Sequence, residues 1–298
     1  MDTEGVTSGL SEDTGETSET PPLVSPAWVR ERLDEFATSD PDLRLVEVDM
    51  NPAFYEVAHL PGAVGFDWRH DLQADRVRDI PSPSAFADLL GSHGIGPDTT
   101  IVVYGDNANW FAAHFYWVAS YYGHADVRLL DGGRTYWTEH DMPTTDEVPT
   151  YPRVTYPTPT ADESIRAYRR EVSRALESET ALVDVRMPEE YRGDLVAPPG
   201  TDEGARRGGH LPGAVNVRWS ANVGPDRRFR SREELATMYA DAGVGRGEDV
   251  ITYCRIGERS SVTWFVLSEL LGYDAVRNYD GSWAEWGNLV GAPVAVGE

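Results

Sequence analysis

The stretch "DVITYCRIGERSSVTWFVLSELLG" (residues 249–272) joins a short β-rich run, a loop with glycine and arginine, and a longer apolar run. The run "VITY" has apolar side chains on both faces, which is typical of a strand buried in a parallel sheet. Cys254, the single cysteine of the chain, follows this strand directly, and we expect a helix to begin near Ser260. Strand and helix signals alternate elsewhere too, which predicts an α/β fold. Sites in such sheets form where loops leave the carboxyl ends of strands, so Cys254 marks a candidate site.

The chain contains the same unit twice. The motif "HLPGAV" occurs at residues 59–64 and again at 210–215, each time after an apolar strand and an acidic turn. Residues 99–137 also match residues 248–286 without a gap. A repeat of this length is too long for a solenoid, so it predicts a tandem duplication of a whole domain.

The duplication and the local composition together predict four segments. Residues 1–22 are acidic, lack bases and carry few apolar groups, so we expect a disordered tail. Residues 23–141 form the first unit and residues 161–298 the second. Between them, residues 142–160 are rich in proline and threonine, which is typical of an extended linker.

The composition excludes several classes of partner. The 298 residues include 50 acids against 26 bases, the net charge is −24, and no lysine occurs. Such a surface repels nucleic acid and anionic lipid, and an acidic surface without lysine indicates a protein adapted to high salt. One cysteine cannot form an internal disulfide, and one cysteine with scattered histidines makes a zinc site untenable. No apolar stretch is long enough to span a bilayer and no signal-peptide pattern is present, so we expect a cytoplasmic protein.

The residues around Cys254 indicate a reactive thiol. The loop at 255–259 can curl so that its backbone N–H groups converge on the sulfur, and Gly257 permits the tight turn. These N–H groups, a helix N-terminus and the charges of Arg255 and Arg259 would lower the pKa of the thiol. The structural alternative is a buried cysteine that packs as a small hydrophobe, but arginine, glycine and glutamate neighbours disfavour it. We therefore predict a nucleophile that attacks an anionic substrate.

These motifs resemble one known family. The repeated "HLPGAV", the stretch "YDGSW" (279–283) and above all the loop "CRIGERSS" (254–261) are similar to those of tandem-domain rhodaneses, especially the prokaryotic thiosulfate type. The resemblance covers about residues 23–298. It implies two rhodanese-like α/β domains, each with a mainly parallel sheet and helices on both faces. It also implies that the first domain is catalytically silent and that the second carries the cysteine.

The resemblance further implies thiosulfate sulfurtransferase chemistry. The Cys254 thiolate takes the outer sulfur of thiosulfate, sulfite leaves, and a persulfide passes the sulfur to cyanide or to another thiophilic acceptor. Donor and acceptor are small molecules, and no cofactor or metal is implied. Because no second cysteine can act as a resolving thiol, the acceptor must come from outside the chain.

Individual roles follow from the same comparison. Vertebrate rhodaneses have basic residues at the positions of Ile256 and Glu190, so donor recognition here is expected to depend on Arg255, Arg259 and the loop amides, with Glu258 pointing to solvent. Asp184 and Arg186 are expected to form a buried pair that supports the loop, with substrate contact by Arg186 as the alternative. The candidate donor-binding residues are Arg255, Ile256, Gly257, Glu258, Arg259, Ser260, Arg186 and Arg69.

Two aromatic or basic groups of the first unit complete the expectations. In the silent repeat Gly105 is in register with Cys254, and Trp110 with Arg259. Trp110 could form an apolar wall over the persulfide or simply pack in the core. Arg69, next to Trp68, could line a cleft if the two units face each other, or lie in a solvated loop.

Three other functions stay open at this point. Mercaptopyruvate sulfurtransferases share the fold but have glycine after the cysteine, so Arg255 favours thiosulfate. Cysteine-dependent phosphatases and arsenate reductases need Cys-x5-Arg, whereas Arg259 is one residue too close and Ser260 occupies the sixth position. A sulfur-carrier or interaction module is the third alternative. The sequence does not specify the cellular acceptor, the oligomeric state or the purpose of the inserted loop at 193–209.

Overall fold

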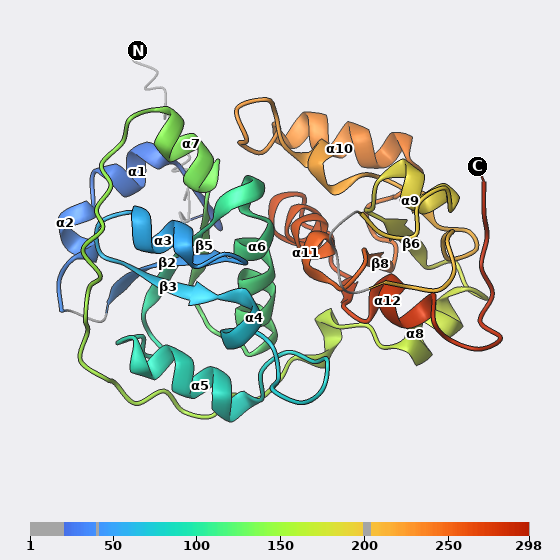
Figure 1. Ribbon diagram of the computed structural model, residues 1–298. Coiled ribbons are helices and arrows are strands. Elements are labelled where there is room, and N and C mark those ends of the chain that lie inside the picture. The colour runs from blue at the N-terminus through green and yellow to red at the C-terminus, as the bar shows by residue number, and fades with distance from the viewer. Residues whose placement is uncertain (1–20, 40–41, 199–203, 298) are drawn as a thin grey trace, which may run out of the picture.

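A computed structural model describes residues 21–39, 42–198 and 204–297. Two α/β units lie next to each other, the first drawn in blue to green and the second in yellow to red (Figure 1). This arrangement confirms the predicted fold of two tandem domains with parallel sheets. The acidic tail predicted at 1–22 falls almost wholly outside the described residues, as does part of the loop at 193–209.

The first unit is a five-stranded sheet in the order β1-β5-β4-β2-β3, with parallel pairing throughout. Its strands are β1 (Leu23–Val24), β2 (Leu43–Asp49), β3 (Ala63–Asp67), β4 (Thr100–Tyr104) and β5 (Val127–Leu130). Its helices are α1 (Pro26–Arg30), α2 (Leu33–Phe36), α3 (Ala53–Val57), α4 (Trp68–Asp71), α5 (Pro83–Ser92), α6 (Asp106–Tyr121) and α7 (Gly133–Glu139). Side chains of α5 and α6 pack on one face of this sheet, and those of α1, α2 and α7 on the other.

The second unit has a four-stranded parallel sheet in the order β7-β6-β8-β9. Its strands are β6 (Ala181–Asp184), β7 (Val215–Asn216), β8 (Val250–Tyr253) and β9 (Val276–Tyr279). Its helical segments are η1 (Glu163–Ile165), α8 (Arg169–Ala175), α9 (Pro188–Arg192), η2 (Trp219–Asn222), α10 (Arg232–Asp241), α11 (Glu258–Phe265), η3 (Val266–Leu270) and α12 (Ser282–Trp286). Helices α10 and α11 pack on one face, while α8 and α12 cover the other.

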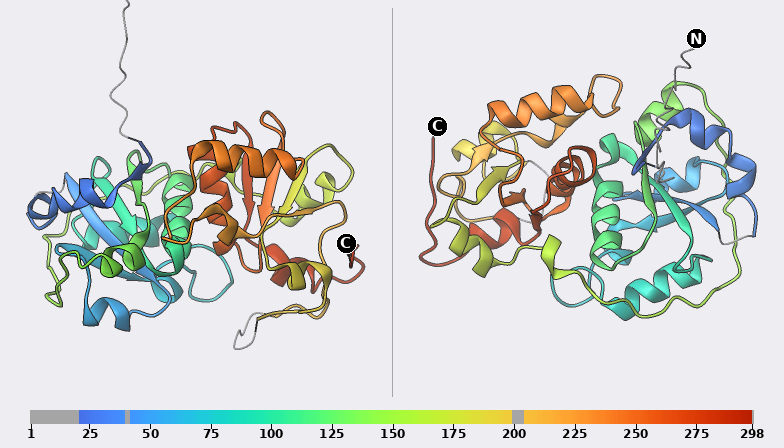
Figure 2. Two further views of the ribbon diagram at one scale, coloured as in Figure 1. Left: turned by 90° about the horizontal axis from the view of Figure 1, so that it is seen from above. Right: turned by 180° about the vertical axis from the view of Figure 1, so that it is seen from behind.

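The two units share a hydrophobic core. Helices α6 and α11 lie side by side between the two sheets (Figure 1), and the view from behind shows the same contact (Figure 2). Tyr116 of α6 packs edge-on against Phe265 of α11, with ring centroids 4.9 Å apart, and its hydroxyl donates to Glu269. Burial of aromatic side chains on both helices couples the units, because separating them would expose that surface to water. The contact brings the helix that follows Cys254 directly against the first unit.

The duplication is visible in individual contacts. The Tyr104 hydroxyl accepts a hydrogen bond from the backbone N–H of Leu60 at 3.0 Å, and the Tyr253 hydroxyl accepts one from Leu211 at 3.1 Å. Each bond ties the last residue of the central strand to the "HLPGAV" motif of its own unit. The repeat therefore preserves a structural contact around the end of β4 and of β8, where the candidate site lies.

The linker at 142–160 contains no helix and runs around the outside of the first unit (Figure 1). Its Tyr151 is buried, and the hydroxyl donates to the carbonyl oxygens of Phe36 and Gly62 at 2.9 and 2.8 Å. The guanidinium of Arg44 lies 3.7 Å from the centroid of the Tyr151 ring. These contacts anchor the segment to the first unit.

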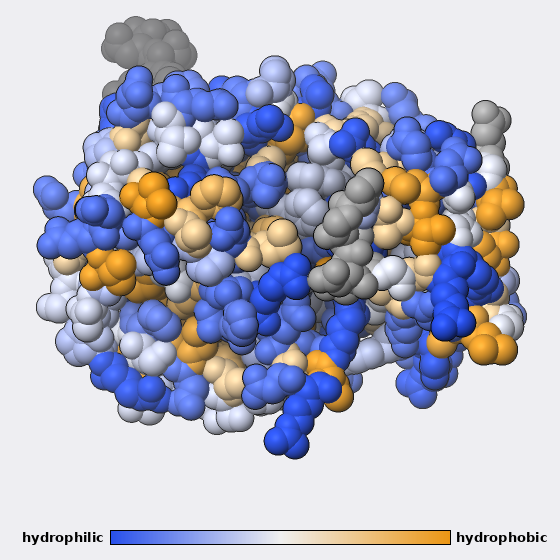
Figure 3. Space-filling view, viewed as in Figure 1, coloured by the Kyte–Doolittle hydropathy of each residue, from blue (hydrophilic) through white to orange (hydrophobic). Residues whose placement is uncertain are grey.

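The surface in Figure 3 is mainly hydrophilic, with hydrophobic residues in small separate groups. The large exposed apolar side chains, such as Val57, Val77 and Val290, lie in different parts of the chain. Scattered exposed apolar residues are normal for a folded protein and mark no docking surface. Within the described residues, none of the helices combines the length and hydrophobicity needed to cross a bilayer.

Candidate active site

Cys254 lies between the end of β8 and the start of α11, and its side chain is fully buried. The loop turns at Gly257, whose φ of 94° is in the left-handed region, and a Cβ there would lie 2.5 Å from Asp280 Cα. Only glycine fits this turn without strain. The turn aims the Gly257 backbone N–H at the thiol, with a nitrogen-to-sulfur distance of 3.1 Å. The predicted convergence of loop amides on sulfur is thus present for this amide.

Glu258 points inward, so the expectation that it faces solvent is wrong. Its side chain is 1% exposed, and its Oε2 accepts a hydrogen bond from the Cys254 thiol at 3.4 Å. The helix begins at Glu258 rather than near Ser260. Residues four apart lie on the same side of a helical turn, so the earlier start carries the carboxylate back over the sulfur.

The electrostatic setting of the thiol also differs from expectation. Burial raises the pKa of the Cys254 thiol, and the charge of Glu258 raises it further. The charge of Arg259 and hydrogen bonds from Ser260 act in the opposite direction but do not outweigh these two causes. The prediction of a lowered pKa is therefore wrong for this closed state, because it counted the cations and amides but not burial or Glu258. A raised pKa favours the protonated thiol over the thiolate.

Arg259 is engaged by a carboxylate that the sequence reasoning treated only as a departure from the family pattern. Its Nη1 and Nη2 donate to the two oxygens of Glu190 on α9 at 2.8 and 3.1 Å. Both side chains are buried, and although burial would raise it, hydrogen bonds from Arg259 hold the pKa of Glu190 below its usual value. The pair neutralises the guanidinium, so the full charge of Arg259 is not available to a donor anion.

Arg186 is likewise held by a partner. Its Nη2 lies 2.5 Å from Oδ2 of Asp184 and also donates to the Gly209 carbonyl at 2.6 Å, and both charged side chains are fully buried. The structure thus contains the buried Asp–Arg pair that the sequence suggests, at the end of β6 next to β8. A fully buried Arg186 makes no contact with solvent, so the alternative of direct substrate contact requires the site to open.

Three side chains hold the Gly257 carbonyl oxygen of the loop in place. Ser260 Oγ donates to the Gly257 carbonyl at 3.0 Å, and Ser261 Oγ and Asn278 Nδ2 donate to the same oxygen at 2.9 Å each. The Ser260 hydroxyl lies 2.7 Å from Asn278 Oδ1 as well. These contacts hold the turn at Gly257 in place. They engage the Ser260 hydroxyl, which the sequence analysis named as a candidate for binding the sulfur donor.

The first unit contributes to the site in two ways. Trp110 stacks on Phe111 with centroids 5.1 Å apart, and its ring lies 5.7 Å from the guanidinium carbon of Arg259. Gly105, in register with Cys254, has no room for a side chain, because a Cβ there would overlap the carbonyl oxygen of Val48. The first unit therefore places an aromatic wall beside the active loop of the second and holds no nucleophile of its own at that position.

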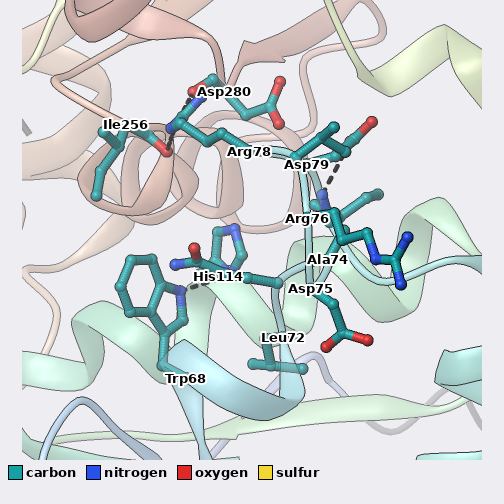
Figure 4. Close-up of a pocket in the computed structure, with 13 residues that line it drawn as sticks. Trp68, Leu72, Ala74, Asp75, Arg76, Arg78, Asp79, His114, Ile256 and Asp280 are labelled. Atoms are coloured by element: carbon teal, nitrogen blue, oxygen red, sulfur yellow. Dashed lines mark hydrogen bonds between the residues drawn. The ribbon is translucent and has the colours of Figure 1, made fainter.

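A cavity of about 330 Å³ lies between the units beside the active loop (Figure 4). Residues 72–80 of the first unit form most of its wall, together with Trp68 and His114, and Ile256 and Asp280 close it from the second unit. Arg69 is not part of this wall. Its exposed guanidinium contacts Met50 Sδ at 3.5 Å, so the expectation that Arg69 lines the cleft is not met in the closed state.

Arg78 ties the two units together at this cavity, and sequence reasoning missed it. Its Nη2 donates to the carbonyl oxygens of Ile256 and Asp280 at 2.5 Å each. Nearby, Arg166 pairs with Asp79 at 2.5 Å and with Asp280 at 2.9 Å. The available signal was the pair of arginines in "ADRVRD" (74–79) of the first unit. Arg78 therefore links the first unit to the loop after Cys254 and to the loop after β9.

Removing the hydrogen bonds of Arg78 to the Ile256 and Asp280 carbonyl oxygens should make the Cys254 thiol more accessible. We expect Arg78→Ala to raise the rate of Cys254 alkylation by iodoacetamide about tenfold or more, because each hydrogen bond from a charged donor is worth about 1.5–3 kcal/mol. Arg76→Ala is the matched control, since Arg76 lines the same cavity and is exposed. Equal alkylation rates for Arg78→Ala and the wild type would show that the hydrogen bonds of Arg78 do not limit access of the reagent to Cys254.

Among the described residues, no cluster of three or more histidine, cysteine, aspartate or glutamate side chains is arranged to hold a metal ion.

Comparison with known proteins decides the family. The model of the rhodanese-like domain matches this chain twice, over residues 25–140 and 169–289. The chain belongs to the rhodanese family. The two matches coincide with the two α/β units, and the second contains Cys254 and the loop after it.

Relatives with named functions point to sulfur transfer. A Haloferax volcanii protein, provisionally named as a thiosulfate sulfurtransferase, is 55% identical over 92% of this rhodanese and 96% of its own length. The sulfur carrier protein TtuD of Thermus thermophilus is 50% identical over 93% of this chain and 97% of its own. A solved variant of EanB in complex with ergothioneine superimposes with a TM-score of 0.80 at 27% identity, covering 93% of this chain and 70% of that one. These relatives support a sulfurtransferase.

Proposed function

We propose that this rhodanese is a thiosulfate sulfurtransferase whose nucleophile is Cys254. The sulfur of Cys254 attacks the outer sulfur of thiosulfate, the S–S bond of the donor breaks, and sulfite leaves with the bonding electrons. The persulfide then transfers its outer sulfur to cyanide or another thiophilic acceptor, and Cys254 is released. The observation that carries the proposal is the single thiol at the start of α11, held 3.1 Å from the Gly257 amide in a loop that donates N–H groups.

The two units would divide the work. Residues 161–298 carry the nucleophile and residues 23–141 are catalytically silent, since Gly105 stands where the second unit has Cys254. The silent unit would shield the persulfide from water with Trp110 and cover the loop through Arg78. The persulfide is prone to attack by water-borne thiols and oxidants, so a buried site protects it until the acceptor arrives.

Thiosulfate is the proposed donor, with 3-mercaptopyruvate as the alternative. As the sequence predicts, donor recognition is assigned to Arg255, Arg259 and the loop amides, and Arg259 also contacts Glu190 in the resting site. A guanidinium can donate two hydrogen bonds to sulfonate oxygens, which a glycine at this position could not do. A small sulfonate dianion therefore suits Arg255 better than a ketoacid does.

The experiment compares the two donors by intact mass. Incubation with thiosulfate should add one sulfur atom to the chain and release sulfite, and cyanide should remove that sulfur as thiocyanate. 3-Mercaptopyruvate should load the protein more slowly at equal concentration. If 3-mercaptopyruvate adds sulfur under conditions where thiosulfate does not, the proposed donor is wrong and 3-mercaptopyruvate takes its place.

Arg255 provides a second test of donor recognition. We expect Arg255→Ala to lower kcat/KM for thiosulfate roughly ten- to a hundredfold, which corresponds to the loss of one charge-assisted contact of about 1.5–3 kcal/mol. Arg255→Lys keeps the positive charge but lacks the paired N–H groups of a guanidinium. Its kcat/KM should therefore lie between those of the wild type and Arg255→Ala. Wild-type donor kinetics in Arg255→Ala would place the anion site elsewhere.

A sulfur-carrier function is the second candidate, supported by the 50% identity to TtuD. A carrier would load from a donor in the same way but discharge to a protein partner rather than to a small thiol. The phosphatase alternative is weaker, because Arg259 is one residue closer to Cys254 than the Cys-x5-Arg motif requires. Cytoplasmic localisation and stability that depends on high salt stay predictions from the sequence.

A further inference from the structure

The strongest unassigned feature of the site is the carboxylate beside the nucleophile. Cys254 is fully buried and Glu258 is 1% exposed, and the thiol donates directly to Glu258 Oε2 at 3.4 Å. Placing a carboxylate next to a sulfur that must attack a dianion is electrostatically unfavourable. It is useful only if the carboxylate takes part in the reaction or shapes the loop.

The Cys254 thiol and the Glu258 carboxyl are in direct contact inside a buried site, so a proton can pass between them. Water is excluded, so a proton that leaves sulfur needs an acceptor inside the site. Arg259 is paired with Glu190, and Glu258 is the first residue of α11. His114 on α6 is neutral, because burial lowers its pKa to about 3. The remaining charged groups on the elements around the pair are Arg255, Asp184, Arg186, Arg78, Arg166 and Asp280.

We propose that Glu258 is the catalytic acid–base group that moves the proton between Cys254 and the donor and acceptor. The proposal rests on the sulfurtransferase function proposed above. In the first half-reaction Glu258 takes the thiol proton, the Cys254 sulfur forms a bond to the outer sulfur of thiosulfate, and the donor S–S bond breaks. The leaving sulfite accepts the proton. The sum is thiol plus thiosulfate giving the persulfide anion plus hydrogen sulfite.

The second half-reaction uses the same carboxylate when the acceptor is a thiol. Glu258 takes the proton of the incoming thiol, whose sulfur then attacks the outer sulfur of the persulfide. The S–S bond to Cys254 breaks, and its electrons remain on the Cys254 sulfur. Glu258 returns the proton to that sulfur, which restores the thiol-to-carboxylate hydrogen bond seen in the resting structure. The acceptor leaves as its own persulfide anion, so atoms and charge balance.

The proposal separates acceptors that bring a proton from those that do not. A neutral thiol such as 2-mercaptoethanol must lose its proton to attack at neutral pH, whereas sulfite attacks as an anion. A purely electrostatic Glu258 would slow both acceptors by repulsion, so its removal would accelerate both. A purely structural Glu258 would, on removal, slow both acceptors equally at every pH.

The test measures persulfide discharge in a single turnover. Wild type, Glu258→Gln and Glu258→Asp are loaded with thiosulfate, freed of donor, checked by intact mass, and mixed with 2-mercaptoethanol or sulfite at several pH values. We expect Glu258→Gln to slow discharge to the thiol at pH 7 by about 100-fold or more. The deficit should shrink as pH rises through the pKa of the thiol, while discharge to sulfite is not slowed. Glu258→Asp should retain part of the rate and the wild-type pH dependence.

Glu179→Gln is the matched control, because it removes the same charge from an exposed position of the same unit. Discharge of Glu258→Gln to 2-mercaptoethanol at pH 7 at the wild-type rate or faster would overturn the proposal, as would equal slowing with both acceptors at all pH values. If Glu258→Gln does not fold, Glu258→Asp serves as the test instead. A Glu258→Asp protein whose discharge to 2-mercaptoethanol lacks the wild-type pH dependence would then overturn the proposal. A wild-type protein that gains no sulfur would contradict the sulfurtransferase function itself, which is a separate result.

Discussion

Replacing Cys254 with serine should abolish sulfur loading from thiosulfate, lowering turnover by more than about three orders of magnitude. A hydroxyl is a far weaker nucleophile than a thiol, and no other cysteine exists in the chain to substitute for it. The measurement is intact mass after incubation with thiosulfate, combined with thiocyanate formation in the presence of cyanide.

Serine is also the appropriate control for structure. It is close to cysteine in size, so the loop and its contacts from Ser282 and Gly257 should persist. Thermal unfolding of the variant should therefore stay near that of the wild type. A Cys254→Ser protein that still gained one sulfur atom would falsify the assignment of the nucleophile.

Arg259→Met should lower the free energy of unfolding by about 3–5 kcal/mol, the cost of leaving one member of a buried ion pair without its partner. Glu190 would then be a buried, uncompensated carboxylate at the centre of the second unit. Replacing both residues, as Arg259→Met with Glu190→Leu, should recover most of the stability, since no charge is left unpaired. Urea unfolding of the wild type, both single variants and the double variant measures the coupling.

The same variants have opposite pH dependence. In the wild type Arg259 lowers the pKa of Glu190, so this group stabilises the fold above its unfolded pKa, and the contribution is lost as pH falls through the lowered value. Without Arg259, burial alone would raise the Glu190 pKa, so Arg259→Met should gain stability as pH falls and the carboxyl becomes protonated. An Arg259→Met protein as stable as the wild type at neutral pH would show that the pair is solvated rather than buried.

The local order around Cys254 was predictable from sequence because it depends on neighbouring residues. A short β-rich run, a glycine that can adopt positive φ and an apolar helical run specify a strand, a turn and a helix in that order. The duplication added the second sheet and showed that Gly105 is in register with Cys254. The position of the thiol at the end of β8 follows from these features alone.

The helix start was misplaced by two residues, and this error had chemical consequences. Glu258 is charged, and sequence reasoning assigned it to solvent because isolated carboxylates seldom lie in an interior. Its burial depends on the turn at Gly257, which begins α11 early and directs the side chain to the sulfur. The prediction that the pKa of Cys254 is lowered was wrong for the same reason, because it did not count the buried Glu258 carboxylate.

By itself, the sequence determined two α/β units, the single cysteine and its place at the carboxyl end of a strand, since periodicity and loop chemistry are local properties. The tertiary structure decided which charges meet. Arg259 finds Glu190 from α9, Arg186 finds Asp184, and Arg78 reaches across from the first unit to Ile256. Such pairs depend on how strands are ordered and how the two units dock, which no spacing along the chain encodes. Burial then sets their strength, because charges interact strongly only where water has been excluded.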